Sequence, residues 1–173
     1  MFLWAAAGLC QAGAIGIFHT EESSRRELFP SFQSTSADTF RFTDSLRARA
    51  RELLKSPFPE TQIVFERILF KDGATGYIYR ASEIGKVEYM DFAVALDAGG
   101  RVTRVLLTAY RESIGGEVKS KRFMRQFGGK ACGHPLRLNR DIDGISGATL
   151  SARAVTLGVR KAVCFWKAAY GKT

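Results

Sequence analysis

The sequence predicts an α+β fold in which an antiparallel sheet packs against helices. Between residues 62 and 110, short segments rich in Val, Ile, Phe and Tyr are separated by turn signals, which is typical of β-strands. Residues 150–170 instead repeat apolar residues at helical spacing. A group of strands followed by helices is characteristic of the α+β class. The length of 173 residues suits a single domain with short additions.

The N-terminal segment from Phe2 to Phe18 is apolar except for Gln11 and carries no charge. It is long enough for the apolar region of a signal peptide, with the small residues 12–14 as a cleavage site, and barely long enough to span a bilayer as a helix. A buried helix of the fold is the alternative. We expect residues 1–20 to be a signal peptide or membrane anchor, which would place the protein outside the cytoplasm, in the periplasm.

Residues 21–60 are expected to form a linker and one short helix. The stretch 21–40 is polar, contains several serines and includes Pro30, so it predicts a linker or the N-terminal segment of the mature protein. Thr43 or Asp44 can cap a helix that continues to Lys55, because the apolar positions 46, 50, 53 and 54 share one helical face. The following Ser-Pro-Phe-Pro sequence ends this helix.

Residues 61–173 are expected to form the main domain. Strands are predicted at 62–70, 76–80, 87–96 and 102–110, and their short connections favour an antiparallel meander. A turn at 111–116 precedes a basic helix over 117–127, which Gly128 and Gly129 close. The last predicted helix, 150–170, presents Val155, Val159 and Trp166 on one face, and Gly158 is expected to weaken it locally.

The charge of the chain is concentrated in its last third. The net charge is +9, yet residues 1–110 hold equal numbers of basic and acidic residues, whereas residues 111–173 hold thirteen Lys and Arg against four Asp and Glu. Such a region attracts a phosphate group, an acidic partner, an anionic lipid surface or nucleic acid, or it serves only solubility.

Cys132 and Cys164 could pair in an oxidising compartment. No metal site is predicted, because Cys132 and His134 lack a second close pair of ligands.

The segment 143–149, Asp-Gly-Ile-Ser-Gly-Ala-Thr, carries the most specific chemical signal. It predicts a turn, a passage of small residues and then the start of the last helix. Unpaired N–H groups at a helix N-terminus favour a phosphate. Gly147 and Ala148 would let another molecule approach the Thr149 hydroxyl. The alternative is that Ser146 merely caps the helix.

These residues resemble the FMN-binding domain family, the domain shared by the covalently flavinylated subunits of the Na+-translocating NADH:quinone reductase and of the Rnf complex. The family motif Asp-x-x-Ser/Thr-Gly-Ala-Thr is matched at every specified position by residues 143–149. Residues 110–118, Tyr-Arg-Glu-Ser-Ile-Gly-Gly-Glu-Val, are similar to a second segment of the family's short members. The resemblance extends from about Gly73 to Ala169.

The resemblance implies an extracytoplasmic electron carrier in which the Thr149 hydroxyl is esterified to the phosphate of FMN. A separate FAD-dependent flavin transferase that uses Mg2+ would make the bond, and membrane redox proteins would donate or accept the electrons. The resemblance implies no catalytic residues of the chain's own. The other residues implied in cofactor binding are Asp143, Gly144, Ser146, Gly147 and Ala148 of the motif, and Glu112, Ser113, Gly115 and Gly116 of the preceding loop.

Two alternatives to a flavoprotein remain at this point. One is a basic module that binds an anion or partner without flavin; nucleic acid is disfavoured because no motif of that kind is present and export argues against it. The other is a hydrolase with Ser146 or Thr149 as nucleophile and His134 as the base. If flavin is bound, Tyr77, Tyr79 and Tyr110 could flank its ring, although aromatic residues on strands more often belong to the core.

Overall fold

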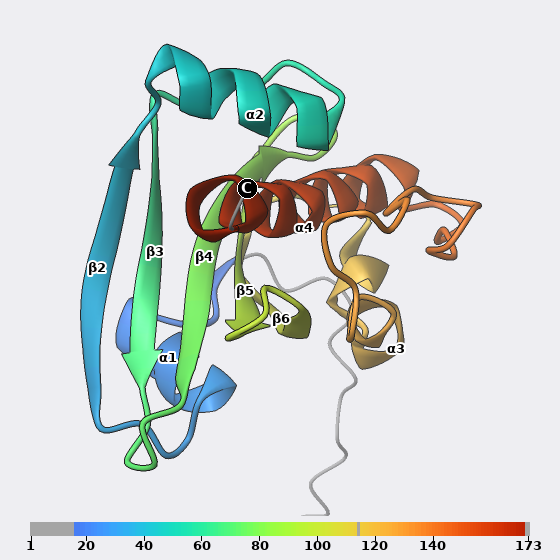
Figure 1. The fold of residues 1–173 in the computed structure, drawn as a ribbon. Coiled ribbons are helices and arrows are strands. Elements are labelled where there is room, and N and C mark those ends of the chain that lie inside the picture. Colours follow the sequence, from blue (N-terminus) through green and yellow to red (C-terminus); the bar gives the residue numbers. More distant parts are fainter. Residues whose placement is uncertain (1–15, 114, 172–173) are drawn as a thin grey trace, which may run out of the picture.

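The computed structural model describes residues 16–113 and 115–171, which form one antiparallel sheet with helices on both of its faces (Figure 1). The strands lie in the order β1-β6-β5-β4-β3-β2. The α+β class and the antiparallel meander are therefore confirmed. In chain order the elements are β1 (Gly16–Ile17), α1 (Glu21–Leu28), β2 (Ser34–Arg41), α2 (Asp44–Leu54), β3 (Gln62–Leu69), β4 (Thr75–Ile84), β5 (Tyr89–Asp97), β6 (Val102–Tyr110), the 3₁₀ helix η1 (Gly116–Lys119), α3 (Lys121–Arg125) and α4 (Thr149–Tyr170).

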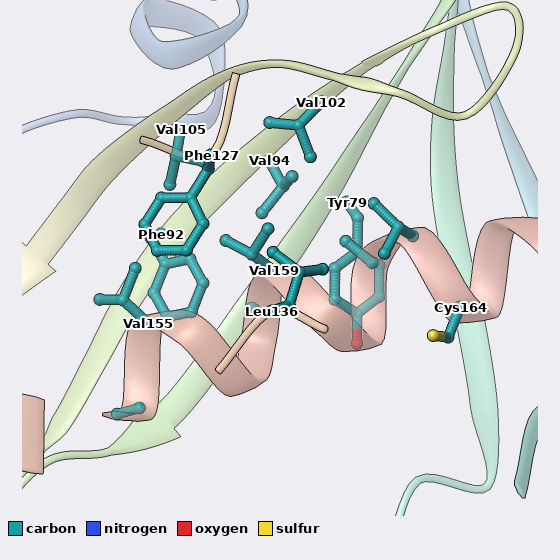
Figure 2. Packing of buried hydrophobic residues seen from close by; sticks show 14 of the residues in the cluster. Tyr79, Phe92, Val94, Val102, Val105, Phe127, Leu136, Val155, Val159 and Cys164 are labelled. Atoms are coloured by element: carbon teal, nitrogen blue, oxygen red, sulfur yellow. The ribbon is translucent and has the colours of Figure 1, made fainter. Parts of the chain in front are cut away.

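The main core lies between the sheet and the long helix α4, with α2 packed beside that helix (Figure 1). Figure 2 shows Phe92 and Val94 of β5 facing Val155 and Val159 of α4. Gly158 is explained by this packing, because a Cβ at that position would lie 2.3 Å from the Phe92 ring. Glycine has a low helical propensity, but at position 158 it allows α4 to approach the sheet closely. A smaller cluster on the opposite face includes Leu28 of α1.

The boundary expected at residue 20 is wrong, because residues 16–20 belong to the folded domain. Gly16 and Ile17 pair with Tyr110 and Ala109 at the edge of the sheet, and the Phe18 N–H donates to the Thr108 carbonyl at 2.8 Å. The remainder of the expected export segment, 1–15, lies outside the described residues. Within the described part of the chain, no helix is both long and apolar enough to cross a membrane.

The linker expected over residues 21–40 is also wrong, since this stretch contains α1 and β2. Thr20 caps α1 by accepting a hydrogen bond from the Ser23 N–H. Strand β2 pairs along its whole length with β3, at the outer edge of the sheet. Most of its side chains are exposed, so the sequence shows none of the apolar alternation that marks a half-buried strand. The helix expected after it is confirmed as α2, with Thr43 as its cap.

The basic helix expected over residues 117–127 is interrupted. It consists of η1 and α3, and Ser120 between them caps α3 by accepting from the Phe123 N–H at 3.3 Å. The last helix is confirmed and begins at Thr149, one residue before the expected start. The motif therefore ends in the first residue of the longest helix of the described chain.

Candidate functional site

Thr149 occupies the first position of α4 and is exposed. The cap residue is Ala148, which has no side-chain hydrogen bond to offer, so the alternative that Ser146 caps the helix is wrong. The first-turn N–H groups of a helix of 22 residues therefore have no side-chain acceptor. Across the described residues, the Thr149 hydroxyl also has no hydrogen-bond partner. A free hydroxyl beside a positive helix end is an arrangement that favours a phosphate group attached to that hydroxyl.

Two glycines give access to this helix end. Gly147 has a φ of +80°, and a Cβ placed on it would meet nothing within 4 Å, so the approach to Thr149 is open. Gly115, with a φ of +86°, packs closely against the start of α4, because its Cβ would lie 2.7 Å from the Ser151 hydroxyl. The family resemblance implies that the loop with Gly115 and Gly116 belongs to the site, and the structure brings Gly115 beside α4. Ser113 of the same loop is exposed, and Gly116 begins η1.

Glu112 is buried, and its carboxylate is bonded to groups of the chain itself. It accepts hydrogen bonds from the backbone N–H groups of Val87, at 2.7 Å, and Glu88, at 3.1 Å, and also from that of Lys86. Its second oxygen lies 3.5 Å from the Ser151 hydroxyl. Burial acts to raise the pKa of Glu112, but these hydrogen bonds to the charged form outweigh it and the pKa is lowered. Glu112 therefore positions the β4–β5 turn against the start of α4.

We expect Glu112→Ala to lower the free energy of unfolding by about 2 kcal/mol, because it removes a buried carboxylate that accepts three backbone hydrogen bonds from the β4–β5 turn. Glu117→Ala is the matched control; this carboxylate is exposed, and we expect a change within about 0.5 kcal/mol. Urea denaturation of both variants measures the difference. Equal stabilities of the two variants would contradict the positioning role of Glu112.

The loop before the motif is organised by Asp141, a residue that the sequence analysis missed. Its carboxylate accepts from the backbone N–H groups of Leu136, at 3.1 Å, and Arg137, at 2.9 Å, and from the Lys130 ammonium at 3.3 Å. Asp143 of the motif is exposed instead. Its backbone is held by Gln126, and in the described residues its carboxylate has no partner. The Asp143 side chain is thus free to contact another molecule.

A cationic hollow of about 250 Å³ adjoins Thr149. Three guanidinium groups line it, and they come from the loop before the motif and from α4: Arg137, Arg153 and Arg160. Asn139 lies beside them, and no carboxylate is among the described lining residues. Guanidinium groups bind phosphate oxygens in a bidentate manner. The exposed hydroxyl, the helix end and the three arginines together fit the phosphate end of FMN.

The tyrosines considered as ring-flanking residues are buried in the core. Tyr77 and Tyr79 are 8% and 7% exposed, and they pack against Trp166 and Phe165 of α4. Tyr110 is fully buried under the Gly115 loop. None of the three has a face open to a flavin ring, so the core interpretation of these residues is the correct one.

Comparison with known proteins finds a family match over the part of the chain that contains Glu112 and Thr149. Residues 85–164 match the model of the FMN-binding domain, and this span contains both the Glu112 loop and Thr149. Among solved structures, the chain is similar to one of the subunits of Na(+)-translocating NADH-quinone reductase from Parabacteroides distasonis, with 18% sequence identity, a TM-score of 0.55 and coverage of 87% of this chain and 85% of that chain. This likeness supports the fold. A search of curated proteins finds no match. The family model thus identifies an FMN-binding domain over residues 85–164 of the chain.

Proposed function

We propose that this protein is an electron carrier that holds FMN in a phosphoester bond to Thr149. The observation that carries the proposal is the exposed Thr149 hydroxyl at an uncapped helix end beside three arginines, inside the matched FMN-binding span. Bound FMN supplies a group that accepts and releases electrons singly or in pairs. The chain's own residues then hold the phosphate and fix the position of the attached group.

The proposed attachment is a transfer from FAD. The Thr149 oxygen forms a bond to the phosphorus of the FMN half, the pyrophosphate P–O bond breaks, and AMP leaves with that oxygen. A threonine hydroxyl is a weak nucleophile without a base to take its proton. No described histidine lines the hollow around Thr149. We therefore assign the base, together with Mg2+, to a separate FAD-dependent flavin transferase.

We also propose that the carrier works outside the cytoplasm, in the periplasm, with membrane redox proteins as its electron donor and acceptor. The apolar N-terminal residues support this location, and a covalent bond keeps the flavin on the protein where free flavin would diffuse away. The exposed Asp143 carboxylate is the motif residue that we expect the transferase to contact. On this proposal the domain carries out no substrate chemistry of its own.

We expect Arg137→Gln combined with Arg153→Gln to slow flavin transfer by about 100-fold or more, because each of the two charged hydrogen bonds to a phosphate contributes roughly 1.5–3 kcal/mol. Both side chains are exposed, so the fold should be retained. Arg122→Gln with Arg125→Gln in α3 is the control with the same charge change outside the hollow. The rate of flavin incorporation from FAD by purified transferase measures the effect. Equal rates in the two double variants would contradict the assigned role of the hollow.

The proposal is tested by producing the full chain in cells together with an active flavin transferase or with an inactive one. We expect yellow protein whose flavin fluorescence survives denaturing electrophoresis only with the active enzyme. The purified protein should lose its visible flavin absorption on reduction by dithionite and regain it in air. A dark band beside an active transferase would contradict the proposal and favour a basic anion-binding module without flavin.

A further inference from the structure

Cys132 and Cys164 form a close pair of thiols that the proposed flavin function does not use. Their sulfur atoms lie 3.3 Å apart, and both residues are free cysteines. A disulfide requires a separation of about 2.05 Å, so closure needs a movement of about 1.2 Å. Cys164 lies in the C-terminal half of α4, as Figure 2 shows. Cys132 lies in the irregular segment that leads to the motif, so a bond between the two would fasten this segment to the helix.

The two thiols differ in exposure and in acidity. Cys132 is half-buried, whereas Cys164 is only 3% exposed. The hydrogen bond between the thiols lowers the pKa of Cys132, burial opposes this, and the positive charges of Lys167 and Arg160 lower it further. The same hydrogen bond and burial raise the pKa of Cys164. An accessible, acidic thiol beside a buried, less acidic one is the arrangement of attacking and resolving cysteines in dithiol proteins.

A second cationic hollow, of about 420 Å³, lies beside this pair. Cys164 lines it, together with Gly133 and His134, which directly follow Cys132. Its basic side chains come from three parts of the chain: Lys55, Arg137, Arg140 and Arg160. No carboxylate is found among the lining residues that the structure describes. Such a hollow attracts anions to Cys164 and to the two residues that follow Cys132.

We propose that Cys132 and Cys164 form a reversible thiol–disulfide site that reacts with small anionic disulfides. The Cys132 thiolate attacks one sulfur of the incoming disulfide, forms a mixed disulfide and releases one thiolate. The Cys164 thiolate then attacks the sulfur of Cys132, closes the internal disulfide and releases the second thiolate. Two electrons pass from the protein to the disulfide, and the two protons of the protein thiols end on the released thiols or in solvent.

The sulfur pair and Thr149 lie at different positions along α4, although their two hollows share Arg137 and Arg160. The two positions are 15 residues apart on one helix, which corresponds to about 22 Å along its axis. The proposal therefore holds whether or not flavin is attached. It concerns the loop from Cys132 to Ile142, whose attachment to α4 would change with the state of the pair.

The experiment uses the full chain with Cys10→Ser, so that the only thiols are Cys132 and Cys164. The reduced protein is mixed with oxidised glutathione, which is anionic, with neutral 2-hydroxyethyl disulfide or with cationic cystamine. Alkylation followed by mass spectrometry counts the remaining thiols over time. We expect closure with glutathione to be about tenfold faster, at low salt, than with cystamine. This preference should shrink in Arg137→Gln with Arg140→Gln but persist in the matched control Arg122→Gln with Arg125→Gln.

Single cysteine variants test the order of attack. Cys164→Ser should accumulate one glutathione on Cys132, whereas Cys132→Ser should take up almost none, because Cys164 is buried. Retention of both thiols with every disulfide would overturn the proposal. Equal rates with the anionic and cationic disulfides, or uptake of glutathione by Cys132→Ser alone, would overturn it as well.

Discussion

Thr149→Val is expected to abolish covalent flavin and to leave the fold unchanged. Valine keeps the shape of threonine but lacks the hydroxyl that the proposed phosphoester requires. Thr149 is exposed, and its hydroxyl makes no hydrogen bond within the described residues, so we expect the free energy of unfolding to change by less than about 0.5 kcal/mol. Fluorescence of the denatured band, after production with an active transferase, measures the loss.

The matched control for this variant is Thr149→Ser, which restores a hydroxyl at the same helix position. We expect fluorescence to return in Thr149→Ser and to stay absent in Thr149→Val, while urea denaturation shows similar stabilities for both. Covalent flavin in the valine variant would place the attachment on another residue. Loss of folding in the valine variant would contradict the exposed position of Thr149.

Lys161→Ala is expected to lower the free energy of unfolding by about 3–5 kcal/mol, the typical cost of removing one partner from a buried ion pair. The Lys161 ammonium is 7% exposed and lies 2.7 Å from carboxylate oxygens of both Glu60 and Glu83. Burial acts to lower the pKa of Lys161, but the hydrogen bonds that it donates to the two carboxylates outweigh burial and the pKa is raised. The side chain is therefore charged, and its removal leaves two carboxylates close together and unpaired.

Lys167→Ala is the comparison for this effect, since Lys167 lies on the same helix but is exposed. We expect it to change stability by less than about 0.5 kcal/mol. Urea denaturation of the two variants under the same conditions measures the contrast. A loss below about 1 kcal/mol in Lys161→Ala would show that the triad with Glu60 and Glu83 contributes little to the core.

The elements that the sequence predicts well are those with a local signal. The strands from β3 to β6 and the helix α4 have clear apolar patterns, and the turn followed by small residues places Thr149 within one residue of the observed helix start. Strand β2 was missed because an edge strand with exposed side chains has no such pattern. Strand β1 was missed because only its pairing with β6 identifies it.

The sequence motif predicts the position of Thr149, but it does not predict the residues that surround Thr149 in the folded chain. Residues 143–149 identify Thr149, but Arg137 and Arg153 meet beside it only because the loop folds back onto α4. The basic excess of the last third was the one signal of this hollow in the sequence. The positioning role of Glu112 depends on N–H groups more than twenty residues earlier in the chain, which no local pattern reveals.

The most direct test of the account is to locate the flavin on the chain by mass spectrometry. Trypsin cleaves after Arg140 and Arg153, so Thr149 lies in the peptide 141–153 together with Ser146 and Ser151. Fragmentation of this peptide from flavinylated protein separates the three hydroxyl groups. We predict one FMN, linked through its phosphate to Thr149. An unmodified peptide, or FMN on Ser146 or Ser151, would contradict the account.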